Sequence, residues 1–181
     1  MSGWLSEAKA VDTAVYAAVA GSDTPRLDAA MRRLSRTADK SKLWVGVAAG
    51  LGVLGGSRGR TAAVQGLASL GVASAFANLV AKPLSHRRRP ERRELEELAG
   101  RHVPMPRTSS FPSGHAASAF AFATGAGAAA PALSAPLRAL ATLVGYSRVH
   151  TGVHYPADVL AGAFIGVSAA EVAGRLLRRR G

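Results

Sequence analysis

The sequence predicts an all-α fold, a multi-span transmembrane helical bundle. Hydrophobic residues make up 48% of the 181 residues although the net charge is +12, and they are concentrated in blocks between short basic, Pro-containing or Gly-containing segments. Such blocks are typical of membrane helices, and their many Gly and Ala residues allow helices to approach closely. The length suits one domain, which we expect to cover residues 1–181.

Residues 1–40 precede these blocks and predict two amphipathic surface helices. Residues 8–20 carry apolar side chains at helical spacing but are too few to span a bilayer. The next helix begins at Pro25, a residue favoured in the first turn, and has Leu27 and Met31 on one side and arginines elsewhere. We interpret it as lying on the membrane surface, although a helix packed on the rest of the domain has the same pattern.

Five apolar segments follow and predict five spans. The first is short, so we expect it to extend backward through Lys42 and Lys40, whose side chains can reach the headgroups. A basic turn at residues 57–60 separates the first two segments. A polar loop at residues 82–112, with a short helix at residues 91–99, separates the second from the third. The five segments are residues 43–56, 61–81, 116–130, 137–146 and 155–177.

The excess of basic residues indicates which classes of molecule the protein can bind. A net charge of +12 is compatible with nucleic acid, or with anionic lipid and phosphate. Aromatic residues are only 6% and no nucleic-acid-binding signature is present, so the sequence predicts no nucleic-acid partner. The chain has no cysteine, which excludes disulfides and thiolate metal sites. The N-terminus lacks the pattern of a removable signal peptide.

Three polar stretches lie at the ends of the apolar segments. In an up-and-down bundle, the end of the second segment, the start of the third, the end of the fourth and the start of the fifth share one side. The three stretches are therefore expected to meet at one membrane face, with residues 82–112 as an active-site loop. Their candidate functional residues are Lys82 and Arg89, then Ser113, Gly114 and His115, then Arg148, His154 and Asp158.

These residue types suit the binding and transfer of a phosphoryl group. Lysine and arginine bind phosphate oxygens, and the helix start at Ser113 and Gly114 favours an anion. His154 and Asp158 are four residues apart, so the carboxylate can hold one ring nitrogen and leave the other to attack or to take a proton. A buried ion pair that closes a loop has the same spacing, and the spacing alone does not separate the two.

Together the three stretches resemble the signature of the type 2 phosphatidic acid phosphatase (PAP2) family, which also contains vanadium haloperoxidases and some soluble acid phosphatases. The family pattern is Lys-x6-Arg-Pro, then Pro-Ser-Gly-His, then Ser-Arg-x5-His-x3-Asp, and residues 82–158 contain every fixed position in order. The resemblance implies that His154 is the nucleophile and forms a phosphohistidine, that Asp158 orients it, and that His115 protonates the leaving group and later activates water. It also implies that no metal or other cofactor is used, and the cationic neighbours disfavour a divalent ion.

The resemblance implies a membrane lipid phosphatase that hydrolyses a phosphate monoester or diphosphate of a prenyl lipid or glycerolipid. Some relatives act on decaprenyl-phosphoryl phosphoribose in cell-wall arabinan synthesis, and that substrate stays open. Two other interpretations are a non-catalytic membrane scaffold and a soluble haloperoxidase or acid phosphatase. The intact motifs disfavour the scaffold and the uncharged segments disfavour the soluble enzymes. We expect a multi-pass protein of the plasma membrane, and the sequence assigns neither the side of its active site nor an oligomeric state.

The remaining basic side chains near the motifs are expected to be peripheral. His86, His102 and His150 match no fixed position and are interpreted as loop or surface residues. Arg87 and Arg88 are expected to contact lipid headgroups. Arg92, Arg93 and Arg101 are expected on a solvated or headgroup-facing surface.

Overall fold

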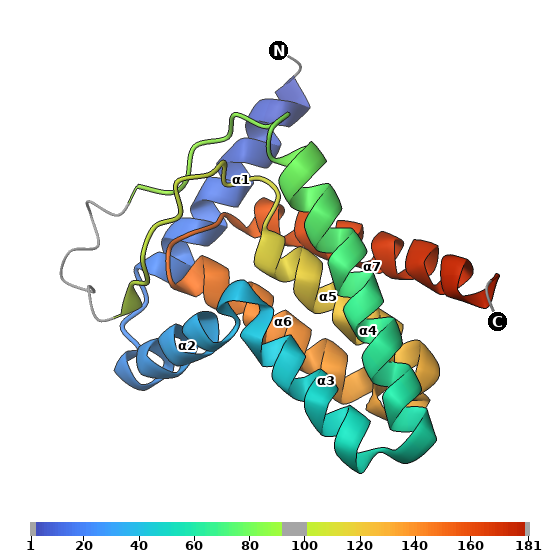
Figure 1. Ribbon diagram of the computed structural model, residues 1–181. Coiled ribbons are helices and arrows are strands. Elements are labelled where there is room, and N and C mark those ends of the chain that lie inside the picture. The colour runs from blue at the N-terminus through green and yellow to red at the C-terminus, as the bar shows by residue number, and fades with distance from the viewer. Residues whose placement is uncertain (1–2, 92–100, 180–181) are drawn as a thin grey trace.

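The computed structural model describes residues 3–91 and 101–179, and these residues form helices and no strands (Figure 1). The all-α prediction is confirmed. The predicted short helix at residues 91–99 lies, apart from its first residue, outside the described residues. The main helices are α1 Gly3–Ala20, α2 Pro25–Thr37, α3 Lys42–Leu54, α4 Gly56–Phe76, α5 Gly114–Ala129, α6 Ser134–His150 and α7 Pro156–Arg178, and the short helical turns are Asp39–Ser41, Ala77–Ala81 and Pro131–Leu133.

Helix α5 forms the centre of the bundle and packs against α4, α6 and α7 (Figure 1). Its sequence is apolar on all sides, which is typical of a helix that other helices enclose. Its alanines at 116, 117, 119, 121, 123 and 126 and Phe122 are fully buried, and the Phe122 ring lies 5.2 Å from the ring of Trp44 on α3. Small side chains therefore let the neighbouring helices come close to α5.

Two glycines bring α7 against the first turns of α5. A Cβ atom at Gly162 would lie 2.4 Å from the Ser113 carbonyl oxygen, and one at Gly166 would lie 2.4 Å from that of Ala117. No other residue type fits at either position without moving the backbone. The resulting close approach allows the Ser113 amide to donate a hydrogen bond to the Asp158 carbonyl at 2.9 Å, which joins the second and third motifs.

The connection between α3 and α4 comes earlier than the sequence predicts. The chain turns at Gly55 and Gly56, where Gly56 has φ +58°, and residues 57–60 already belong to α4. A Cβ at Gly59 would lie 2.2 Å from the Leu51 carbonyl oxygen, so the absence of a side chain permits the tight helical hairpin. The prediction of a turn at residues 57–60 was wrong. Gly55 and Gly56 form the turn, and Gly59 allows the first turn of α4 to pack closely against α3.

Among the residues that the structure describes, two helices are long and apolar enough to cross a membrane, namely α4 with its continuation, Gly56–Ala81, and α7, Pro156–Arg178. Helices α3, α5 and α6 have 13, 16 and 17 residues, fewer than the ~20 residues that a perpendicular span requires. The prediction of five spans therefore stays a prediction. Helix α4 ends in a π-helical turn, Ala77–Ala81, directly before Lys82, and such turns are frequent at functional sites.

The two N-terminal helices make contacts with the rest of the protein that the sequence does not predict, and their prediction as membrane-surface helices stays a prediction. On α1 the buried side is Asp12, Tyr16 and Ala20, whereas Val11 and Val15 on the predicted apolar face are exposed. The sequence interpretation missed this because the buried aspartate is satisfied by contacts that only the tertiary structure supplies.

The apolar side of α2 is largely covered by the rest of the protein. Met31 is buried and Leu34 packs against the central core, whereas Leu27 remains partly exposed. Helix α2 lies against α6. The alternative of a helix packed on the rest of the domain therefore describes Met31 and Leu34, and contact of α2 with a membrane surface stays a prediction.

Candidate active site

The three motifs meet where α4 ends and α5 and α7 begin, as the alternation of apolar segments predicts. The Arg89 guanidinium lies 3.3 Å from Nε2 of His154, which joins the first and third motifs. A Cβ atom at Gly114 would lie 3.3 Å from the Lys82 ammonium, which joins the first and second. Residues up to 76 positions apart in the chain thus form one polar site.

His154 lies in the loop before α7, and Asp158 is the third residue of that helix. Nδ1 of His154 lies 3.5 Å from Oδ2 of Asp158, slightly long for a hydrogen bond, a feature common at catalytic sites without substrate. The same Asp158 oxygen accepts a hydrogen bond from the Tyr155 amide at 2.9 Å, and the carboxylate is fully buried. The helix start therefore fixes the carboxylate beside one nitrogen of the ring and leaves Nε2 directed toward Arg89.

The surroundings of His154 keep its imidazole neutral. Burial is the largest cause and lowers the pKa of His154 from 6.5 to about 4; the neighbouring Asp158 carboxylate opposes this shift, and the charges of Arg89 and Arg148 add to it. A histidine with this pKa has an unprotonated nitrogen at neutral pH. That state is the one a nucleophile needs.

Arg89 is held rigidly by backbone and hydroxyl acceptors. Its guanidinium donates to the Val153 carbonyl at 2.7 Å, to the Thr108 carbonyl and hydroxyl at 3.0 and 3.3 Å, and to the Ser109 carbonyl at 3.1 Å. These contacts fix the direction of the guanidinium beside His154. An arginine held in this way can donate to the oxygens of a phosphate.

The other two cations reach the site from α4 and α6. Lys82 donates to the Asn78 side chain at 2.9 Å, and burial lowers the pKa of Lys82, with Arg89 and Arg148 contributing further. Arg148 is almost fully buried and donates to the Ser35 hydroxyl. Three cations held this close repel one another, and a bound phosphate dianion would relieve that repulsion.

Ser113 and Gly114 form the start of α5. The Ser113 hydroxyl accepts a hydrogen bond from the Ala116 amide at 3.4 Å and so caps the helix, while the Ser113 amide is bound to Asp158. The hydroxyl proton remains a donor, and the first amides of the helix, including that of Gly114, have no acceptor within the helix. The helix start therefore keeps donors for an anion even though the Ser113 amide is committed elsewhere.

The structure adds a carboxylate that the sequence interpretation missed. Asp39, on the turn between α2 and α3, lies 2.9 Å from Nε2 of His115 and 3.7 Å from the Arg148 guanidinium. No local sequence signal connects Asp39 with residues 76 positions away. Its proximity depends on the packing of the N-terminal segment over the start of α5.

The expectation for Arg87 was wrong. Arg87 forms an ion pair with Asp158 at 2.8 Å and a second with Asp12 of α1, and its guanidinium lies over the Tyr155 ring at 4.4 Å from the centroid. Asp12 also accepts a hydrogen bond from the Ala157 amide at 2.8 Å. Arg87 and Asp12 therefore hold the start of α7, and with it Asp158, in position rather than contacting lipid headgroups.

The expectations for His150 and Arg101 were also wrong. Both side chains are buried and contact Asp28 of α2. The Asp28 carboxylate lies 2.7 Å from Nε2 of His150 and 3.1 Å from the Arg101 guanidinium. Arg101 also donates to the Val19 and Ala20 carbonyls. This buried cluster ties α1 and α2 to the end of α6, which carries Arg148.

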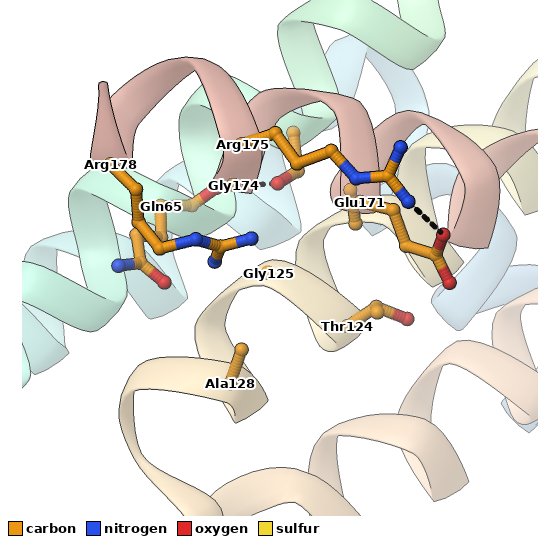
Figure 2. Close-up of a pocket in the computed structure, with 10 residues that line it drawn as sticks. Gln65, Thr124, Gly125, Ala128, Glu171, Gly174, Arg175 and Arg178 are labelled. Atoms are coloured by element: carbon orange, nitrogen blue, oxygen red, sulfur yellow. Dashed lines mark hydrogen bonds and ion pairs between the residues drawn. The ribbon is translucent and has the colours of Figure 1, made fainter. Parts of the chain in front are cut away.

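Two hollows differ in their relation to these residues. A polar one of about 160 Å³ opens beside His115 and Lys82, and its wall includes Ser74, Asn78 and Ser118. Figure 2 shows a larger one of about 390 Å³ between α4, α5 and α7, near the C-terminal end of α7, where Arg175 is paired with Glu171. The larger hollow contains none of the motif residues, whereas the smaller one is lined by Lys82, Gly114 and His115 and belongs to the candidate site.

The PAP2 superfamily model matches residues 62–181 of the chain. The chain belongs to the PAP2 superfamily. Over 157 residues it is 35% identical to the decaprenylphosphoryl-5-phosphoribose phosphatase of Mycolicibacterium smegmatis (strain ATCC 700084 / mc(2)155), a match that covers 84% of this chain and 79% of that protein. The chain is therefore a phosphoric ester hydrolase, a PAP2-type lipid phosphatase, and the scaffold interpretation is set aside.

Two solved structures share the fold. The transmembrane PAP2-type phosphatidylglycerolphosphate phosphatase from Bacillus subtilis aligns with a TM-score of 0.72 at 22% identity, over 96% of this chain and 87% of that one. LpxE of Aquifex aeolicus aligns with a TM-score of 0.69 at 22% identity, over 90% and 94% respectively. With the two apolar helices, these likenesses indicate a membrane protein.

Proposed function

We propose that this PAP2 phosphatase is a multi-pass enzyme of the plasma membrane that removes the terminal phosphate from a polyprenyl-phosphoryl phosphoribose. The mycobacterial relative is named for this reaction, and the match extends over most of both chains. A polar hollow beside His115 supports the same substrate class. Helices α3, α5 and α6 complete five spans in this proposal, with the bilayer locally thinned around these short helices.

The reaction proceeds in two steps through His154. In the first, Nε2 of His154 bonds to phosphorus while the bond from phosphorus to the leaving oxygen breaks. Asp158 holds the Nδ1 proton and stabilises the charge that develops on the ring. His115 donates a proton to the leaving oxygen, so that an alcohol departs and a phosphohistidine remains.

The second step reverses the role of His115. The now neutral imidazole takes a proton from water, whose oxygen attacks phosphorus, and the bond between phosphorus and His154 breaks. Inorganic phosphate leaves and both histidines return to their starting states. Lys82, Arg89 and Arg148 bind the phosphoryl oxygens throughout, which supports a reaction that needs no divalent ion.

The hollow beside His115 is the observation that carries the substrate proposal. The leaving group must lie on the side of the phosphate that faces the acid, and this side is lined by the hydroxyls of Ser74 and Ser118 and the amide of Asn78. The two hydroxyls are hydrogen-bonded to each other at 2.9 Å. A site with such groups favours a leaving group that carries hydroxyls, such as a pentose, over a bare prenyl chain.

A substrate comparison tests the proposal. The purified enzyme in mixed micelles is given four lipids: a polyprenyl-phosphoryl 5-phosphoribose, a polyprenyl diphosphate, phosphatidylglycerol phosphate and phosphatidic acid. We expect kcat/KM for the phosphoribosyl lipid to be about tenfold or more above the others, and Ser118→Ala to reduce that preference while the exposed Ser168→Ala does not. Equal or higher kcat/KM for any of the other three lipids would overturn the proposed substrate.

A further inference from the structure

Each histidine of the site has its own carboxylate, and the one beside His115 has no counterpart in the family pattern. Asp39 lies outside residues 62–181, which match the family model. Its Oδ1 atom is 2.9 Å from Nε2 of His115 and 3.7 Å from Arg148. Among the described residues it is the only carboxylate paired with His115.

The turn that carries Asp39 is held in an unfavourable backbone conformation. Lys40 has φ 52° and ψ 31°, and Ser41 has φ 59° and ψ 16°, so two successive non-glycine residues occupy the left-handed region. Such strain persists only where the surroundings fix it, and it is frequent at functional sites. Here the buried residues Ala38 and Trp44 anchor the two sides of the turn.

The charges around His115 explain what a carboxylate adds. Lys82 and Arg148 face the imidazole, as does Asp39, and positive neighbours disfavour the protonated ring that must donate to a leaving oxygen. The hydrogen bond from His115 is the largest cause of the lowered pKa of Asp39, so the carboxylate is ionised when it binds the ring. Its negative charge opposes the two cations.

We propose that Asp39 is a positioning residue that orients His115 and favours its protonated form for leaving-group protonation. A protonated imidazole has two N–H donors, so one can stay on Asp39 while the other serves the leaving oxygen. The role rests on the proposed function of His115. It predicts that the first chemical step depends on Asp39 only where the leaving group needs a proton.

Two substrates with different leaving groups test this role in the full-length enzyme. Dodecyl phosphate releases an alkoxide that requires protonation, whereas 4-nitrophenyl phosphate releases a phenolate that is stable without it. For Asp39→Asn we expect kcat on dodecyl phosphate to fall about tenfold to a hundredfold, less than for His115→Asn. The pre-steady-state burst of 4-nitrophenolate should remain within about twofold of wild type in both variants, because it reports the first chemical step alone.

The pH profile and two further variants separate orientation from folding. Loss of the carboxylate should move the high-pH limb of kcat on dodecyl phosphate to lower pH, because His115 then loses its proton more readily. Asp39→Glu should restore part of the activity and of the limb. Asp23→Asn, an exposed acid on the preceding turn, should leave both unchanged.

Other results contradict the proposal in distinguishable ways. An equal loss for Asp39→Asn on dodecyl phosphate and in the burst would make Asp39 a structural residue. Unchanged or increased turnover of dodecyl phosphate would overturn the role, and an increase with a lower KM would make Asp39 a block that substrate must displace. A His115→Asn variant whose burst falls as much as its dodecyl phosphate turnover would instead overturn the assignment of His115 on which the inference rests.

Discussion

The two histidine–aspartate pairs of the site differ in almost every physical property. His154 and Asp158 are four residues apart, and the Asp158 carboxylate is fully buried and bound by Arg87 and the Tyr155 amide. His115 and Asp39 are 76 residues apart, and 46% of the Asp39 side chain is exposed on a strained turn. The first pair is local in the sequence and buried, while the second is brought together by tertiary packing and is partly exposed.

The difference matches the two tasks of the proposed mechanism. A nucleophile must keep one tautomer and one direction through both steps, which burial and a helix start provide. An acid that later becomes a base must exchange protons with the leaving group and with water, which an exposed pair allows. Variants at the two pairs should therefore fail in different ways.

Removal of the nucleophile should have the largest effect. We expect His154→Ala to lower turnover by about four orders of magnitude on every substrate, including 4-nitrophenyl phosphate, because no covalent intermediate can form. Phosphate release in detergent measures this loss. His86→Ala, which removes an exposed histidine of the loop at residues 82–112, is the control, and near-normal turnover in His154→Ala would make His154 a structural residue.

Asp158→Asn should come next. The replacement keeps the shape but can hold the wrong tautomer of His154, so we expect a loss of about two to four orders of magnitude in kcat on both alkyl and aryl phosphates. An equal loss on both kinds of substrate distinguishes Asp158→Asn from Asp39→Asn, in which the first step on an aryl phosphate should be nearly unchanged. Size-exclusion chromatography measures the folded fraction of Asp158→Asn. Full activity per folded molecule would show that Asp158 does not orient His154 for catalysis.

Arg87 should show an intermediate effect that combines activity and stability. Arg87→Met leaves the buried Asp158 and Asp12 carboxylates without their shared cation, which should lower the free energy of unfolding by about 1–3 kcal/mol and kcat by about tenfold. Thermal unfolding in detergent and phosphate release measure the two. The exposed neighbour Arg88→Met is the matched control, and equal behaviour of the two variants would remove Arg87 from the support of Asp158.

The pH dependence should separate the pairs without any mutation. Because the pKa of His154 in the free enzyme is lowered from 6.5 to about 4, kcat/KM should fall on the acid side only near pH 4, when the nucleophile becomes protonated. Asp39→Asn should leave this acid limb in place while it moves the alkaline limb. An acid limb near pH 6.5 would mean that His154 is more solvated than the site geometry implies.

Metal removal should have the smallest effect. The three cations already supply positive charge, so turnover should be unchanged by EDTA, while vanadate, which resembles the phosphoryl transition state, should inhibit. A zinc-reversible loss of activity in EDTA would show that a histidine binds metal and would replace the two-pair account.

The sequence predicted the His154–Asp158 pair and missed the His115–Asp39 pair. His154 and Asp158 could be paired because one helical turn separates them, and the alternation of apolar segments predicted which helix ends meet. Asp39, and the contacts of Arg87 with Asp12, depend on how the N-terminal helices pack over segments 75 or 76 residues away, which no periodicity records. On α1 the apolar pattern also gives no sign that Asp12, outside the apolar face, is buried against partners from other segments.

Trapping of the covalent intermediate tests the central claim most directly. In His115→Asn with 4-nitrophenyl phosphate, the first step needs no acid while the second lacks its base, so the account predicts that a phosphorylated protein accumulates. After a rapid alkaline quench and proteolysis, mass spectrometry should locate nearly one phosphate per chain on His154. The same experiment with His154→Ala should give none. Absence of phosphoprotein in His115→Asn despite a normal nitrophenolate burst, or phosphate on any residue other than His154, would contradict the account.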